Sequence, residues 1–152
     1  MRITPQTELR QRIGGLQAEM LRHDFDAILM VQNADLFYFT GSIQQGMLYV
    51  PAEGEPLYMV RKDHGRARME SGLKEVIPLR SPKDVLGILG EHGLPKPQRL
   101  GMELDVLPVL THQRLLKALG DCQFGDATPL IRTVRAVKSE YEIGILKDAA
   151  LI

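Results

Sequence analysis

The stretch Ala27-Ile-Leu-Met-Val-Gln-Asn-Ala-Asp-Leu-Phe-Tyr-Phe-Thr-Gly41 decides the fold class of this chain. Its first five residues, Ala27–Val31, are apolar without alternation, which is typical of a strand that is covered on both faces. Asn33 or Asp35 is expected to cap a short helix, and Gly41 stands where a helix commonly ends. A buried strand that leads directly into a helix indicates an α/β arrangement.

Strand and helix signals alternate on both sides of this stretch, apart from one expected hairpin. Before it, an amphipathic helix is expected to begin with Thr4 as its cap and Pro5 as its first residue. The elements expected after it are hairpin strands Met47–Pro51 and Leu57–Arg61, a helix His64–Ser71 capped by Asp63, an edge strand Glu75–Leu79, a helix after Ser81, a strand Arg99–Leu104, a helix Leu107–Leu119 with Leu110, Leu115, Leu116 and Leu119 inward, a strand Gln123–Gly125 and a helix from Thr128. The order predicts an α/β fold with a mixed, mostly parallel sheet, one hairpin and helices on both faces.

Composition restricts the possible functions of the chain. Its 152 residues suit one ordinary domain, and its 19 basic and 19 acidic residues cancel, so nucleic acid and membrane surfaces are not expected as partners. The longest apolar runs, Ala27–Val31 and Leu36–Phe39, are too short to span a bilayer, and the first residues do not form a targeting signal. Cys122 is the single cysteine and is expected to be buried and inert. A cytoplasmic location is therefore expected.

The last residues carry a well-signalled helix start. Ser139 and Glu142 have the spacing of a capping box, and Ile143, Leu146 and Ala150 follow at helical intervals. We expect residues 1–136 to form one domain, and residues 137–152 to be a linker and the first helix of a second domain that carries the catalytic residues. The alternative is a terminal helix that frays.

One group of carboxylates could carry chemistry. Asp35 follows the first strand, and Glu103 and Asp105 lie at the end of a later strand, where open α/β sheets bind ligands. Three carboxylates there could hold magnesium, which favours a phosphoryl-transfer or nuclease-like domain as one alternative function. The favoured interpretation is that Asp35 and Asp105 cap the helices that follow while Glu103 makes a structural hydrogen bond, because Asp is a common cap after a strand. A crevice at the same strand ends would suit a third alternative, an independent small-molecule binding module.

Three segments, taken in order, resemble the N-terminal domain of the creatinase / aminopeptidase P / prolidase family, the pita-bread metallopeptidases. They are Asp26–Met30 with Asn33–Gly41, then Leu100–Glu103, and finally Ile131–Ser139 with Glu142-Ile143. The last of these is similar to the junction that leads into the family's catalytic domain. The resemblance implies a mixed-sheet, RNase H-like domain with a catalytic domain after residue 152.

This resemblance also implies a function. Members of the family are Xaa-Pro dipeptidases and aminopeptidases, and some hydrolyse creatine. They hold two divalent metals, often manganese, cobalt or zinc, through two Asp, one His and two Glu, and these metals supply a bridging hydroxide. Those ligands belong to the catalytic domain, so the fragment itself is expected to hold no metal, no cofactor and no catalytic residue, and not to hydrolyse peptides.

The expected contribution of this domain is assembly and substrate bordering. Family resemblance implies a homodimer, and it implies that the loop Ser42, Ile43, Gln44 and Gln45 limits the peptide substrate site. The alternative is that this loop is only a connector. Tyr38 and Thr40, which precede the loop, are expected to be packing and turn residues.

Overall fold

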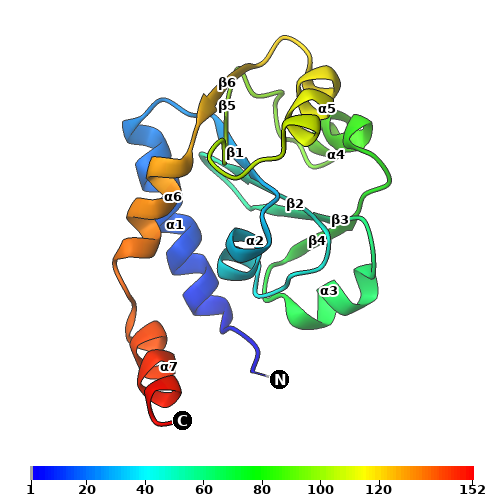
Figure 1. Ribbon diagram of the computed structural model, residues 1–152. Coiled ribbons are helices and arrows are strands. Elements are labelled where there is room, and N and C mark those ends of the chain that lie inside the picture. The colour runs from blue at the N-terminus through cyan, green and yellow to red at the C-terminus, as the bar shows by residue number, and fades with distance from the viewer. Residues whose placement is uncertain (1) are drawn as a thin grey trace.

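The computed structural model describes residues 2–152, which contain one six-stranded mixed sheet flanked by helices (Figure 1). The strands are β1 (Ala27–Met30), β2 (Gly46–Pro51), β3 (Leu57–Val60), β4 (Glu75–Pro78), β5 (Arg99–Met102) and β6 (Gln123–Asp126). They lie in the order β4-β3-β2-β1-β5-β6. The β1–β2 and β2–β3 pairs are antiparallel and the other three pairs are parallel, so the predicted mixed sheet with its hairpin is confirmed.

Helices cover both faces of the sheet, as predicted (Figure 1). Helices α1, α2, α3 and α6 contribute to a core on one face, and α4 and α5 contribute to a core on the other. The helix bounds are α1 (Gln6–Arg22), α2 (Asn33–Thr40), α3 (His64–Glu70), η1 (Pro82–Asp84), α4 (Val85–Glu91), α5 (Val109–Leu119), α6 (Thr128–Ala136) and α7 (Glu140–Ala150), where η1 is a single 3₁₀ turn. None of the described helices has the length and apolarity that a membrane span requires.

The position of β1 between two cores explains why its sequence lacks polar alternation. Ile28 and Met30 point into the core beneath α1, whereas Ala27 and Leu29 point into the core beneath α4 and α5. All four side chains are at most 1% exposed. Because successive residues of a strand face opposite sides, a strand covered on both faces must be apolar at every position.

Several local signals have the predicted outcome. Gly41 ends α2 with a left-handed backbone (φ 78°), and Asp63 caps α3 by accepting from the amide of Arg66. Ser81 caps η1 in a capping box. Strand β4, which contains Pro78, lies at the sheet edge, where a missing backbone donor is tolerated.

Other local predictions are wrong. Pro5 occupies the position before α1, and Thr4 makes no cap for that helix. Neither Asn33 nor Asp35 caps α2, because the side chain of Gln32 accepts from the amide of Asp35 at 3.0 Å. In α5, Leu110 is 58% exposed rather than inward, because the buried side of this helix is formed by its second half.

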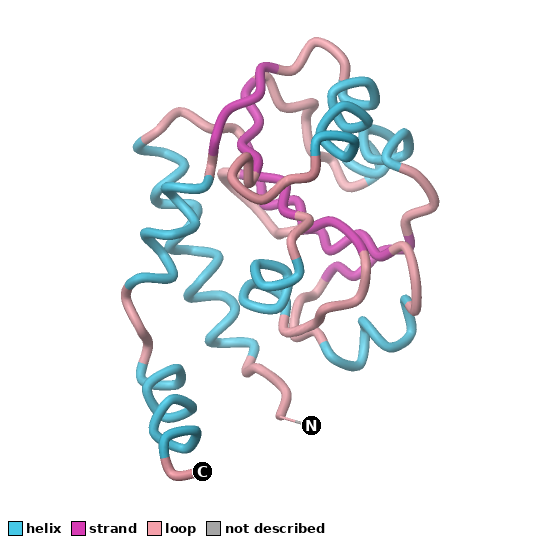
Figure 2. The backbone as a smooth tube through the Cα atoms, viewed as in Figure 1, coloured by secondary structure: helices cyan, strands magenta, loops and turns pink. Residues whose placement is uncertain are grey.

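Helix α7 extends beyond the rest of the fold. Figures 1 and 2 show it following α6 through a loop and lying near the start of α1, away from the sheet. Its capping box is formed as predicted, with Ser139 Oγ accepting from the Glu142 amide at 3.2 Å and a Glu142 carboxylate oxygen accepting from the Ser139 amide at 3.1 Å. No residue of α7 is buried.

Candidate functional site

In the loop that connects α2 to β2, two side chains hydrogen-bond to the rest of the fold and two others are exposed to solvent. The Ser42 side chain is buried, and its Oγ donates to Glu70 Oε2 at 2.7 Å. Gln44 Nε2 donates to the same carboxylate at 3.2 Å. Between and beyond these anchors, Ile43 is 56% exposed and Gln45 is exposed. The loop therefore holds an aliphatic and an amide side chain in fixed positions toward solvent.

Glu70, at the end of α3, is the anchor that the sequence did not reveal. Its hydrogen bonds with Ser42, Gln44 and Arg66 lower the pKa of its carboxyl group, with Ser42 the largest cause, although burial acts in the opposite direction. Arg66 Nε lies 2.5 Å from Glu70 Oε1. Since the Tyr58 hydroxyl also donates to the Gln44 carbonyl at 2.6 Å, the loop is tied to both α3 and β3.

Thr40 acts as a turn residue, as predicted. Its Oγ1 donates to the Leu36 carbonyl at 2.6 Å and accepts from the Ser42 amide at 3.0 Å. The hydroxyl thus closes the last turn of α2 and sets the direction in which the loop leaves the helix.

Glu103, which follows β5, is buried against the start of α2. Its side chain is 1% exposed, and Oε2 accepts from the amides of Val31 at 2.9 Å and Gln32 at 3.1 Å. Burial first, and then the neighbouring Asp35 carboxylate, raise the pKa of Glu103 to about 8. The predicted structural hydrogen bonding of Glu103 is therefore confirmed, and the raised pKa favours the protonated form of this carboxyl group.

The alternative of a magnesium site at Asp35, Glu103 and Asp105 is not supported by the structure. Asp105 turns away toward α6, where its carboxylate accepts from Thr128 Oγ1 at 2.8 Å and from Arg132 at 2.7 Å. Asp35 pairs with Arg135 at 2.6 Å. Residues 2–152 bring together no group of three side chains able to hold a metal ion. Asp35 and Asp105 also do not cap the helices expected to follow them, because Gln32 caps α2 and Pro108 occupies the cap position of α5.

The Asp35–Arg135 ion pair begins a polar network that joins α2 to α6 and α1. The Arg135 and Arg12 guanidinium groups lie over the Tyr38 ring, at 5.5 Å and 4.0 Å from its centroid. Arg12 Nη1 donates to the Tyr38 carbonyl at 2.6 Å, and its Nε donates to Glu8 at 2.9 Å. Tyr38 is thus a packing residue, as predicted, whereas Arg12, Glu8 and Arg135 were not singled out from the sequence.

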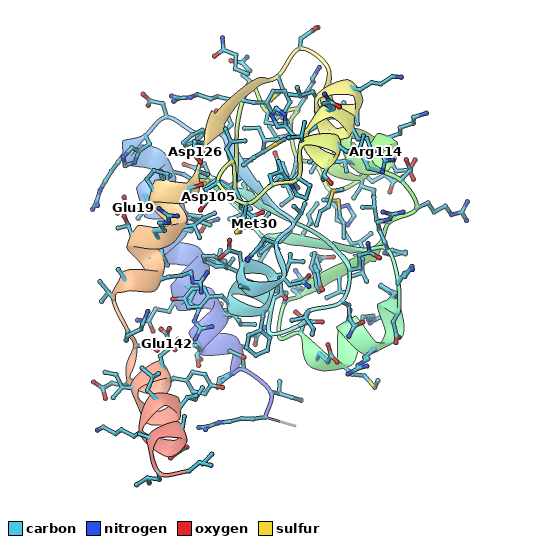
Figure 3. All side chains as sticks on the ribbon, in the orientation of Figure 1. Glu19, Met30, Asp105, Arg114, Asp126 and Glu142 are labelled. Atoms are coloured by element: carbon cyan, nitrogen blue, oxygen red, sulfur yellow. The ribbon has the colours of Figure 1, made fainter. Side chains whose placement is uncertain are left out.

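The same network reaches α7. Ser139 Oγ donates to Glu8 Oε1 at 2.7 Å, and an Arg12 nitrogen lies 3.9 Å from a Glu142 oxygen. Figure 3 shows Glu142 at this junction, between α7 and α1. We call the set Glu8, Arg12, Tyr38, Arg135, Ser139 and Glu142 the junction network. The Glu8, Arg12 and Glu142 side chains are at most 14% exposed, and their contacts fix the start of α7 against the domain.

Cys122 is buried, and burial raises the pKa of its thiol above the ordinary value. Its sulfur lies 3.6 Å from the Gln98 carbonyl. The predicted burial of Cys122 is therefore confirmed, and a buried thiol with a raised pKa is a poor nucleophile.

Comparison with known proteins places this geometry in context. The family model described as "Creatinase/Prolidase N-terminal domain" matches residues 12–137. The chain is 27% identical over 135 residues to an Xaa-Pro dipeptidase of Pyrococcus horikoshii, covering 88% of this chain and 36% of that protein. It is 24% identical over 169 residues to the uncharacterized hydrolase/peptidase y4tL of Sinorhizobium fredii, covering 99% of this chain and 43% of that protein. The chain therefore spans less than half the length of these relatives.

A solved structure shares the fold. The N-terminal domain of the cytoplasmic peptidase PepQ from Mycobacterium tuberculosis superposes with a TM-score of 0.71 at 23% identity. The match covers 82% of this chain and 98% of that structure. The mixed sheet and its flanking helices are thus an architecture that has also been solved as a separate domain.

Protonation of Glu103 makes stability depend on pH. In the folded state the pKa of Glu103 is about 8, above the ordinary value of 4.5. Between these two pH values the folded state therefore holds more protons than the unfolded chain, and the free energy of unfolding falls as the pH rises. Glu103→Gln keeps an acceptor for the Val31 and Gln32 amides without titrating. We expect it to match the parent chain near pH 4.5 and to exceed its stability above pH 8 by on the order of 5 kcal/mol, because each pKa unit corresponds to about 1.4 kcal/mol.

Urea denaturation across this pH window measures the effect. Glu91→Gln is the control, because Glu91 is an exposed glutamate on α4, and its pH profile should follow that of the parent chain. A Glu103→Gln profile with the same slope as the parent would contradict the buried, protonated carboxyl group.

Proposed function

The chain belongs to the creatinase/prolidase N-terminal domain family, and on this premise we propose that it is the non-catalytic N-terminal domain of an Xaa-Pro metallopeptidase, either a dipeptidase or an aminopeptidase. One observation carries the proposal: the family match occupies most of this chain, whereas the chain occupies 36% of the Xaa-Pro dipeptidase that it resembles. The remaining length of such a relative is room for a catalytic domain, which we place after residue 152.

Helix α7 supports the position of that second domain. We assign residues 1–136 to the N-terminal domain, and residues 137–152 to a linker and the first helix of the catalytic domain. Ile145 is 37% exposed and Leu146 is 56% exposed on a helix with a complete capping box. A well-capped amphipathic helix without buried residues is suited to packing against a further part of the protein.

We place the reacting groups in the catalytic domain. Two divalent metal ions, of manganese, cobalt or zinc, would there supply the hydroxide that attacks the peptide bond. Three carboxyl groups near the strand ends are engaged otherwise, since Asp35 and Asp105 bind arginines and Glu103 is buried with a raised pKa. The name of the PepQ relative supports a cytoplasmic location for the whole enzyme.

Substrate bordering is assigned to the loop Ser42–Gln45. Its support is the combination of buried anchors and exposed side chains: Glu70 fixes Ser42 and Gln44, while Ile43 and Gln45 face solvent. A wall that is already ordered loses little conformational entropy when a peptide contacts it. The loop would therefore limit substrate length or shape without itself reacting.

Assembly as a homodimer is supported by an apolar surface on the β5–α5 connection and the first turn of α5. Leu104 and Val106 are 41% and 45% exposed, and Val109 and Leu110 are 72% and 58% exposed. Four large apolar side chains within seven positions of the sequence form an uncommon concentration on a protein surface. A second copy of the chain would remove them from water.

The proposal is tested by comparing the peptidase activity of the 152-residue chain with that of a longer chain. The chain of 152 residues, supplied with Mn²⁺, is expected not to hydrolyse an Xaa-Pro dipeptide, whereas a chain extended through the following coding region is expected to hydrolyse it. The readout is release of free proline. Hydrolysis by residues 1–152 alone, or an inactive extended chain that binds no Mn²⁺, would show the assignment to be wrong.

Substrate bordering is tested by Ile43→Ala in the extended enzyme. Removing an exposed aliphatic contact should raise KM for the dipeptide about fivefold with little change in kcat, because such contacts are worth about 1 kcal/mol. Leu21→Ala is the control, since Leu21 is a similarly exposed aliphatic residue near the end of α1. If KM is unchanged in both variants, the loop does not border the substrate and is only a connector.

The dimer surface is tested by Leu110→Asp in the extended enzyme. A charge placed among the three remaining apolar side chains should weaken dimerisation at least about tenfold, because the carboxylate would lose water on association. Sedimentation velocity over a concentration series measures the shift to monomer. Leu21→Asp, on another surface, should leave the dimer intact, and equal behaviour of the two variants would exclude this surface.

A further inference from the structure

A pocket with a volume of about 550 Å³ lies near the ends of β3 and β4, beside η1 and α5. Five of its lining side chains are cationic and none is acidic; they are Arg61, Arg80, Lys83, Arg114 and Lys117. We call this site the basic pocket. Figure 3 shows Arg114 on the side of the molecule away from Glu142 and α7, so the junction network does not occupy this region.

Three separate segments bring these cations together. Arg61 directly follows β3. Arg80 precedes the Ser81 cap and Lys83 lies within η1, and Arg114 and Lys117 lie one turn apart on α5. The fold holds the segments in place, because α5 packs against η1 and the Leu79 amide donates to the Val60 carbonyl at 2.8 Å. The pocket is therefore a product of tertiary structure rather than of one charged run.

These charges lack partners within the described chain. None of the five side chains forms an ion pair or a side-chain hydrogen bond with another residue among 2–152, in contrast to Arg12, Arg66, Arg132 and Arg135. The nearest acid in sequence, Asp84, instead accepts from the Ser81 amide at 3.2 Å in the capping box. Because the whole chain has a formal net charge of zero, the pocket is a local excess of positive charge.

We propose that the basic pocket binds a small polyphosphate anion, namely a compound that carries a di- or triphosphate group. Three guanidinium groups offer planar pairs of donors that match phosphate oxygens, and two ammonium groups add point charges. All five side chains are exposed, so a single phosphate would be weakly held through solvent, whereas several linked phosphates engage several cations at once.

The shape of the site favours a compact ligand over a nucleic acid. Its volume lies within the range of small-molecule pockets, and its cations converge on one cavity instead of following a long groove. No aromatic side chain lines it, so it offers no platform on which bases would stack. This site is separate from the proposed peptidase function and does not depend on it.

Calorimetric titration of the chain with sodium tripolyphosphate at low ionic strength tests the proposal. We expect one binding site per chain, with affinity reduced at least about tenfold in Arg80→Gln/Arg114→Gln. The matched control is Arg10→Gln/Arg68→Gln, which removes the same charges from exposed arginines outside the pocket and should change the affinity less than about twofold.

Other outcomes would overturn it. Absence of binding, an equal loss of affinity in the two double variants, or equally tight binding of citrate would each exclude a polyphosphate site. Tighter binding of single-stranded DNA, with the same dependence on Arg80 and Arg114, would exclude a small ligand in favour of nucleic acid. If circular dichroism shows Arg80→Gln/Arg114→Gln to be unfolded, Arg61→Gln/Lys117→Gln gives the same comparison.

Discussion

Burial of the Glu103 carboxyl group is the constraint on which the rest of this structure depends. It accepts from two amides of the β1–α2 turn, so it joins the end of β5 to a segment that lies 71 and 72 positions earlier. A charged group at 1% exposure would be costly in this environment, and retention of a proton removes that cost. The parallel pairing of β1 with β5 and the position of α2 are thereby fixed together.

From Glu103, polar contacts continue outward to the last helix. Asp35 lies between Glu103 and Arg135, and Arg135 and Arg12 enclose the Tyr38 ring before Glu8 reaches Ser139. The side chains of Asp35, Glu8 and Arg12 are each at most 8% exposed, so removing the charged partner of any one of them would leave a buried charge without compensation. Such a change typically costs about 3–5 kcal/mol, which is about a fifth or more of the stability of an ordinary domain. The start of α7 is consequently oriented by the domain core rather than by local sequence alone.

Local signals were sufficient for the fold but not for the sites. Uninterrupted apolar residues in Ala27–Met30, Gly41 with its positive φ and the Ser139 capping box act within a few residues, so the sequence predicts them directly. The sequence predicts a capping role for Asp35, because its actual neighbours, Glu103 and Arg135, lie 68 and 100 positions away and no local pattern reveals them. The pairing of Ser42 with Glu70 and the convergence on the basic pocket were missed for the same reason: each depends on how the sheet brings distant segments together.

The basic pocket and the Ser42–Gln45 loop meet at one backbone contact, in which the Arg61 amide donates to the Gln45 carbonyl at 2.8 Å. A bound anion could influence the loop only by interacting differently with two loop conformations. The loop, however, is held independently by Glu70 and by the Tyr58 hydroxyl, and the Arg61 amide belongs to the continuation of the β2–β3 ladder rather than to the pocket's guanidinium groups. The anion would therefore find the loop already in place, and the two sites should act as separate functions on one rigid sheet.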